Sequence, residues 1–244
     1  MSQTNSETGL KPWQILSGSG LKIIAVTTML IDHLAAYYWG QMAFFQTSLL
    51  TVGHRSVTLY MLLRLVGRLS FPIFAFLIVE GFLHTRDRMR YGRNLLLFAL
   101  LSEIPWNLVH SGTWHYPTQN VIFTLLLGYL GLCAIAYFKN DKPRMAGCLL
   151  GLLALSVVLR CDYGCSGYGF ILLLYALRND KLLQAVIGSC VLGSRWIAGL
   201  AFIPINMYNG KRGFIRGSGL QYVFYLFYPV HLLLLYWLKM QMSF

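Results

Sequence analysis

Long apolar runs, separated by short charged segments, dominate this chain. A helix that crosses a bilayer needs about 20 apolar residues, and we expect helical spans over residues 21–38, 57–83, 91–109, 120–138, 145–159, 166–177 and 222–238. Gly193-Ser-Arg-Trp196 interrupts the apolar stretch 182–207, where we expect two short or re-entrant helices. The pattern predicts an all-α fold, a polytopic transmembrane helical bundle of about eight to ten membrane segments.

The predicted spans divide the chain into two regions. Residues 1–20 form a polar segment with Lys11 as its positive charge, which is unlike a cleavable signal peptide. We therefore expect a cytoplasmic N-terminal segment, and a first helix that acts as an uncleaved insertion signal. Residues 21–240 then form a single transmembrane domain, because the spans use up the remaining length.

Composition supports a membrane protein. Charged residues make up 11% of the 244 residues and hydrophobic residues 57%, whereas soluble domains carry roughly 25% charged residues. This excludes an ordinary soluble enzyme, a coiled coil and a disordered chain. The net charge of +12 is explained by basic cytoplasmic loops rather than by nucleic-acid binding.

The basic loops also set the expected orientation. Loops 84–93, 139–144 and 178–181 are basic and alternate correctly if all three are cytoplasmic. A reversal within 182–207 would place the basic loop 209–216 on the same side and the C-terminus outside. The five scattered cysteines fit buried small hydrophobic residues better than a metal site, because further ligands are missing nearby.

Ionisable residues within the apolar runs are the candidates for function. A charged group at the centre of a membrane helix costs roughly 2.5–3.5 kcal/mol even on the lenient insertion scale, so it faces the bundle interior or a wet cavity. Helix rise places several such side chains near the middle of their spans, where they could meet in one polar chamber. These residues are Asp32, His33, Arg68, Glu103 and His231.

Individual roles follow from side-chain chemistry, and structural alternatives stay open. His33 can act as a general base or simply hydrogen-bond a neighbouring helix. We expect Arg68 to pair with Asp32 or Glu103, or to bind an anionic group, while Arg64 snorkels outward. Asn120 is placed to cap a helix. Pro72 is expected to kink its span.

Two segments outside the spans carry further candidates. Asp162-Tyr-Gly-Cys-Ser-Gly-Tyr-Gly169 is a glycine-rich turn on the predicted outer side, and it lacks the lysine and hydroxyl residue of a phosphate loop. Lys211 and Arg212 form a compact basic patch that could hold phosphates. Membrane orientation explains the patch equally well.

Together these residues resemble the TraX family, integral membrane proteins of conjugation systems associated with N-terminal acetylation of pilin. The matching stretches occur in order and extend over nearly the whole chain, from residue 21 to 237. They are Leu21-Lys-Ile-Ile24, Asp32-His33, Gly67-Arg-Leu-Ser-Phe-Pro72, Phe74-Ala-Phe-Leu-Ile-Val-Glu-Gly81, Ser102-Glu-Ile-Pro105, Gln119-Asn-Val-Ile-Phe-Thr124, Asp162-Tyr-Gly164, Tyr208-Asn-Gly-Lys-Arg-Gly213 and Phe227-Tyr-Pro-Val-His231.

The resemblance implies an acyltransferase-like domain in the bacterial inner membrane that moves an acetyl group from acetyl-CoA to an amine, in pilin or another acceptor. By analogy with membrane acyltransferases that use an embedded histidine, it implies a catalytic site of His33, Asp32, Arg68, Glu103 and His231. It further implies that Lys211, Arg212 and Arg68 bind acetyl-CoA and that Asn120, Asp162 and Tyr163 bind the acceptor. Direct transfer and an acetylated histidine both remain open.

Two other functions are consistent with the same residues. Buried ionisable groups and broken helices are also typical of proton-coupled transporters, although the chain is short and shows no repeat. A non-catalytic assembly factor for pili would need the polar residues only to hold helices together. Solute uptake without consumption of acetyl-CoA would favour the transporter, whereas an inserted His33→Ala variant that keeps its function would favour the assembly factor.

Overall fold

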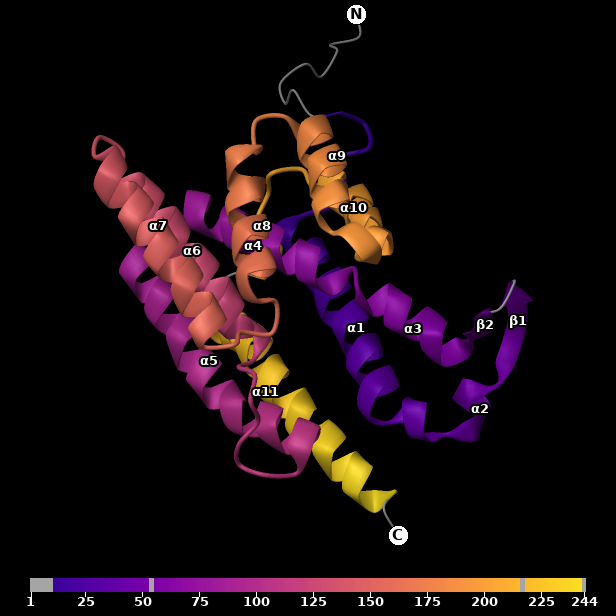
Figure 1. Cartoon of the computed structure of the whole chain (residues 1–244). Coiled ribbons are helices and arrows are strands. Elements are labelled where there is room, and N and C mark those ends of the chain that lie inside the picture. Colours follow the sequence, from indigo (N-terminus) through magenta and orange to yellow (C-terminus); the bar gives the residue numbers. More distant parts are fainter. Residues whose placement is uncertain (1–10, 53–54, 216–217, 243–244) are drawn as a thin grey trace, which may run out of the picture.

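The computed structural model describes residues 11–52, 55–215 and 218–242. Helices dominate this part of the chain (Figure 1). The elements are α1 (Gly18–Tyr37), η1 (Trp39–Gln41), α2 (Ala43–Gln46), β1 (Ser48–Val52), β2 (Arg55–Thr58), α3 (Leu59–Gly67), α4 (Ser70–His84), α5 (Arg88–Ser111), α6 (Val121–Tyr137), α7 (Lys142–Val158), α8 (Gly164–Ala176), α9 (Lys181–Val191), η2 (Gly193–Ala201), α10 (Phe202–Asn206) and α11 (Ser218–Gln241).

The prediction of an all-α membrane bundle is confirmed. Within the described residues, three helical segments are long and apolar enough to cross a membrane, namely Gly18–Gln41, Leu59–His84 and Gly219–Gln241. The shorter apolar helices include α6 and α8, which pack against α4, and α9, which packs against α8. Helices satisfy their own backbone hydrogen bonds, which is why such segments can lie in lipid.

The predicted span 57–83 consists of two helices, α3 and α4, that meet at Arg68 and Leu69. Pro72 occupies the third position of α4. It lacks an N–H group to bond the carbonyl of Arg68, four residues earlier, and its ring would clash with that carbonyl. The helix therefore breaks at Arg68, one turn before the proline that predicted a kink.

The basic loops gather at one end of the bundle, which we call the basic end. The amide of Gly18 donates to Lys211 O at 2.8 Å, and the amide of Leu16 donates to Met207 O at 2.9 Å. Lys181 Nζ lies 3.4 Å from Tyr208 O. Because Lys181 and Tyr208 lie together, the chain between them turns back on itself, as the interruption at Gly193 predicted.

The opposite end carries the loops between α5 and α6 and between α7 and α8, and we call it the histidine end. Gln119 and Cys161 pair through their backbones there, and Trp106 Nε1 donates to Thr118 O at 2.7 Å. The C-terminus of α11 points the same way (Figure 1). Between α1 and α3 the chain forms η1, α2 and an antiparallel β1–β2 hairpin beside the bundle.

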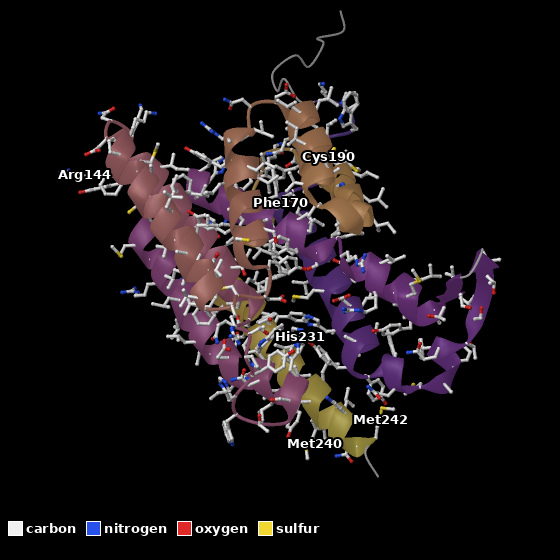
Figure 2. The ribbon with its side chains drawn as sticks, in the orientation of Figure 1. Arg144, Phe170, Cys190, His231, Met240 and Met242 are labelled. Atoms are coloured by element: carbon white, nitrogen blue, oxygen red, sulfur yellow. The ribbon has the colours of Figure 1, made fainter. Side chains whose placement is uncertain are left out.

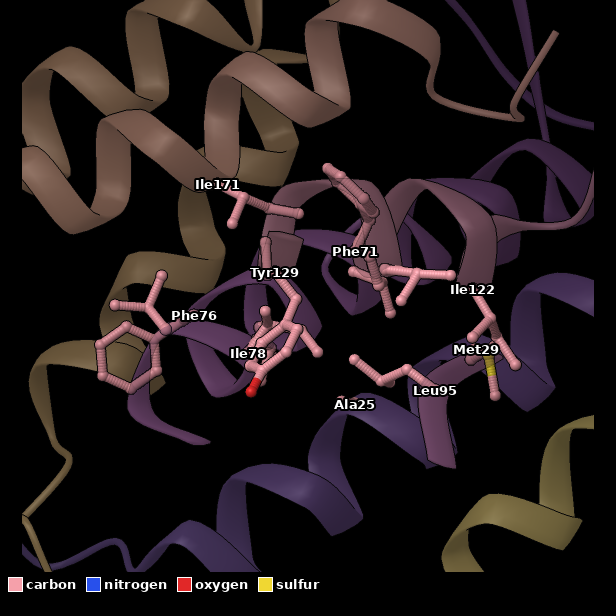
Figure 3. Close-up of a cluster of buried hydrophobic side chains, with 14 of the residues drawn as sticks. Ala25, Met29, Phe71, Phe76, Ile78, Leu95, Ile122, Tyr129 and Ile171 are labelled. Atoms are coloured by element: carbon pink, nitrogen blue, oxygen red, sulfur yellow. The ribbon is translucent and has the colours of Figure 1, made fainter. Parts of the chain in front are cut away.

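The core lies where α1, α4, α5, α6 and α8 converge (Figure 3). Tyr129 of α6 is fully buried, and its hydroxyl donates to Arg88 O at 2.7 Å, which ties α6 to the start of α5. Phe71 at the start of α4 stacks on Tyr163 with ring centroids 3.7 Å apart. This packing fixes α4 and α8, while α1 and α11 carry the polar side chains described next.

Candidate functional site

His33 of α1 and His231 of α11 are in contact. Figure 2 shows His231 on α11. His33 Nδ1 lies 2.7 Å from His231 Nε2. The two rings are nearly parallel, at 3°, with centroids 5.0 Å apart. His231 is buried, at 4% exposure, whereas His33 is partly buried.

Hydrogen bonding fixes the proton positions of this pair. His231 Nδ1 lies 2.8 Å from the carbonyl oxygen of Phe227, which can only accept, so Nδ1 carries the proton. In the neutral ring, Nε2 of His231 is then the acceptor, and His33 Nδ1–H donates to it. Nε2 of His33 is left with a lone pair and no hydrogen bond to any described residue. This atom is therefore able to accept a proton.

A tyrosine–histidine pair lies one turn further along α1. Tyr37 Oη lies 2.7 Å from His110 Nε2, and His110 Nδ1 is held 2.9 Å from Trp106 O. By the same argument the Tyr37 hydroxyl donates to His110. Sequence reasoning missed both residues, although the i, i+4 spacing of His33 and Tyr37 places them on one helix face.

Asp32 faces away from the histidine pair and joins α1 to α3. Arg64 Nη1 lies 2.6 Å from Asp32 Oδ2 and donates to the Asp32 main-chain oxygen at 3.3 Å. Arg68 was expected to pair with Asp32 or Glu103 or to bind an anionic group, and Arg64 to snorkel outward; instead it is Arg64 that forms the ion pair with Asp32. The break at Arg68 turns its exposed side chain out of the bundle, although it stays within electrostatic range of Asp32.

Glu103 and Asn120 form a separate contact between α5 and α6. Asn120 Nδ2 donates to Glu103 Oε2 at 2.6 Å and to Ala99 O at 2.9 Å. Asn120 Oδ1 accepts from the amide of Ile122 at 3.1 Å, which is the predicted helix cap. Both donors of this buried amide are used inside the protein, so none is left for an acceptor substrate.

Asp162 and Tyr163 lie at the histidine end. The carboxylate of Asp162 is exposed and within electrostatic range of Tyr37 and Tyr228. Tyr163 is partly buried by its stacking on Phe71. Asp162, a predicted acceptor-binding residue, therefore lies within electrostatic range of Tyr37, the hydrogen-bond partner of His110.

Lys211 and Arg212 are far from these residues. Their main-chain oxygens bond Gly18 and Ser19 at the start of α1, and α1 rises about 22 Å from Gly18 to His33. The predicted site residues therefore separate into a histidine cluster and a basic cluster at opposite ends of α1. Both basic side chains are exposed, which suits binding of phosphate groups.

The described residues contain no cluster of metal-binding side chains. The five cysteines are free, and Cys148, Cys165 and Cys190 are exposed rather than buried as expected. Cys161 is buried, and burial raises the pKa of its thiol to about 11.

Comparisons with known proteins identify a family and two relatives. A family model described as TraX protein matches residues 17–239. The chain is 30% identical over 250 residues to the probable fimbrial assembly protein FimC, serogroup H1, of Dichelobacter nodosus, covering 90% of this chain and 94% of that protein. It is 23% identical over 121 residues to the uncharacterized protein RP591 of Rickettsia prowazekii (strain Madrid E), covering 50% and 37% of the two chains. No solved structure matches it significantly.

Proposed function

This chain belongs to the TraX family, and from that premise we propose that it is an integral membrane acetyltransferase that moves an acetyl group from acetyl-CoA to an amine. One observation carries the proposal. His33 Nε2 is an unused proton acceptor, held in one tautomer by His231, which is itself anchored on Phe227 O. A base, an orienting partner and a fixed ring are the parts that proton transfer in catalysis requires.

The residues at the basic end fit an anionic acetyl donor. Lys211 and Arg212 have exposed side chains, and their backbone is fixed against α1. These two side chains would hold the phosphates of acetyl-CoA, which supplies the activated acetyl thioester when bound. The hydrogen-bonded His33 and His231, together with Tyr37 and His110, suit acid–base chemistry on that thioester.

The part of His33 in the reaction is to carry one proton. Its Nε2 accepts the proton that the amine loses as the new C–N bond forms. His231 accepts the hydrogen bond from the resulting imidazolium and spreads its charge. The same proton then goes from Nε2 to the sulfur as the C–S bond breaks, so His33 ends the cycle neutral. Asp162 at the histidine end offers a carboxylate that attracts an ammonium-bearing acceptor.

The proposed class of acceptor is based on the name of one relative. Because the Dichelobacter nodosus protein is named a fimbrial assembly protein, we include in the proposal that the amine is the N-terminus of a pilin. The proposed location is the bacterial inner membrane, with the N-terminus and the basic end in the cytoplasm.

The proposal is tested with the full chain purified in detergent. Acetyl-CoA is added with peptides that carry a pilin-like N-terminus, and free thiol and acetylated peptide are measured. We expect turnover by the wild type and a loss of about 10²–10⁴-fold in His33→Ala. His84→Ala is the matched control, because His84 is exposed at the basic end and bonded only to its own helix.

Two results would contradict the proposal. Undiminished thiol release by His33→Ala would show that His33 is not the base. Uptake of a solute by vesicles without consumption of acetyl-CoA would instead favour the transporter hypothesis.

A further inference from the structure

An apolar groove of about 180 Å³ lies between α1 and α11. It is lined by Ile23, Val26, Thr27, Val223, Phe224 and Phe227. Ile23 and Val223 are exposed, so the groove opens to the outside of the bundle. Phe227 links it to the histidine pair, because its ring stacks on His231 and its carbonyl anchors that residue.

Helix periodicity extends the face of α1 that contributes Val26 to the groove toward both ends of the helix. Side chains three, four and seven positions apart share a helix face, so Lys22, Val26, Leu30 and His33 form one stripe along α1. This stripe begins with a cation, continues with apolar side chains and ends at the proposed base.

The start of the stripe is strongly basic. Arg212 lies within electrostatic range of Lys22 on α1 and of Tyr225 on α11. Its main-chain oxygen accepts from both the amide and the hydroxyl of Ser19, each at 3.0 Å. Arg212 is thereby held at the mouth of the groove, beside both helices that form it.

The dimensions of the stripe suit one kind of ligand. From Lys22 to His33 the helix rises about 16 Å. The arm of coenzyme A has about thirteen bonds between its sulfur and its nearest phosphorus, and at the rise of an extended backbone these span about 15 Å. A ligand with phosphates at Lys22 and Arg212 therefore has an arm of the length needed to reach His33.

We propose that the α1–α11 groove holds the pantetheine arm of the acetyl donor, with Lys22 and Arg212 binding its phosphates. This inference rests on the proposed function and adds Lys22 and the groove side chains as donor-binding residues. A larger cavity of about 250 Å³ at the basic end is the competing location. It is lined by Arg178 and Lys181 as well as by Glu80, but by no residue of α1 or α11, so it does not lead toward His33.

The test measures binding of coenzyme A and of adenosine 3′,5′-bisphosphate, which has no pantetheine arm, to the full chain in detergent. Val223→Trp fills the groove and should weaken binding of coenzyme A about tenfold, while leaving the bisphosphate unaffected. Lys22→Met should weaken both ligands about tenfold, as expected for loss of a charge-assisted contact.

Matched controls separate the groove from general effects of substitution. Leu226→Trp is the control for Val223→Trp. Leu226 is on the same helix and is 46% exposed, against 59% for Val223, but it does not line the groove. Lys142→Met removes a cation at the start of α7. Both controls should bind both ligands like the wild type.

The outcomes distinguish this inference from the proposed function. Equal affinity of wild type and Val223→Trp for coenzyme A overturns the groove assignment, even if His33-dependent thiol release persists. Selective loss of coenzyme A binding in Val223→Trp supports the groove, even if no amine is acetylated. A wild type that binds neither ligand overturns both.

Discussion

Gly67 of α3 packs directly against the side chain of Asp32 on α1, so the two helices cross with no room for another carbon atom. One turn earlier on α3, Arg64 pairs with the same carboxylate at 2.6 Å. The missing side chain at position 67 allows the close approach, and the ion pair joins the two helices beside it. Asp32 therefore holds helices together, next to a histidine that faces the opposite way.

Gly67→Ala should destabilise the protein by about 1–3 kcal/mol, because the added Cβ would overlap the Cβ and Oδ1 of Asp32. Thermal unfolding in detergent measures the change. Gly151→Ala on α7 is the control, since a Cβ there would meet no atom within 4 Å. It should be neutral or stabilising by up to about 1 kcal/mol. Equal melting temperatures of the two variants would show that α3 and α1 do not pack as described.

His231→Ala should lower the kcat of acetyl transfer by about 10²-fold while the KM for acetyl-CoA stays unchanged. The substitution removes the acceptor of the His33 Nδ1–H bond, so the ring loses its fixed tautomer. His231→Gln retains an acceptor oxygen and should recover part of the rate. Steady-state kinetics with the thiol-release assay test this, and a rise in KM with unchanged kcat would refute a positioning role.

Asn120→Ala should cost about 3 kcal/mol, because it removes the helix cap and leaves the Glu103 carboxylate without its 2.6 Å donor. Unfolding measurements compare it with Asn179→Ala, an exposed position between α8 and α9 that should change stability by less than about 0.5 kcal/mol. A stable Asn120→Ala variant with a raised KM for the amine would instead assign this residue to acceptor binding.

Cys165 and Cys161 provide a test of orientation. Cys165 is exposed at the histidine end, so a variant with Cys165 as its sole cysteine should react with a membrane-impermeant maleimide added outside intact bacterial inner-membrane preparations. Cys161 is buried with a pKa raised to about 11. The thiolate is the reactive form, so this thiol should resist labelling at pH 7.5 and react faster as the pH approaches that value. Labelling of Cys165 only after lysis would place the histidine end in the cytoplasm.

The sequence by itself determined the fold class and most of the helices. Apolar runs of this length fold as membrane helices because no other open structure satisfies the backbone in lipid. The reversal within 182–207 was also predictable, since Gly193 and its neighbours interrupt an apolar run. His33 and His231 could be identified as candidates from the sequence alone, because each is a polar residue within an apolar run.

Only the tertiary structure decided which of these residues touch. His33 and His231 are separated by 198 positions, and Arg64 rather than Arg68 reaches Asp32 because the helix breaks at Arg68 and turns that side chain outward. His110 enters the site from a third helix, and Lys211 lies at the far end of α1. Periodicity defines the faces of one helix, but the contacts between helices depend on how each helix is rotated and crossed against its neighbours, and that is set by packing of the whole chain.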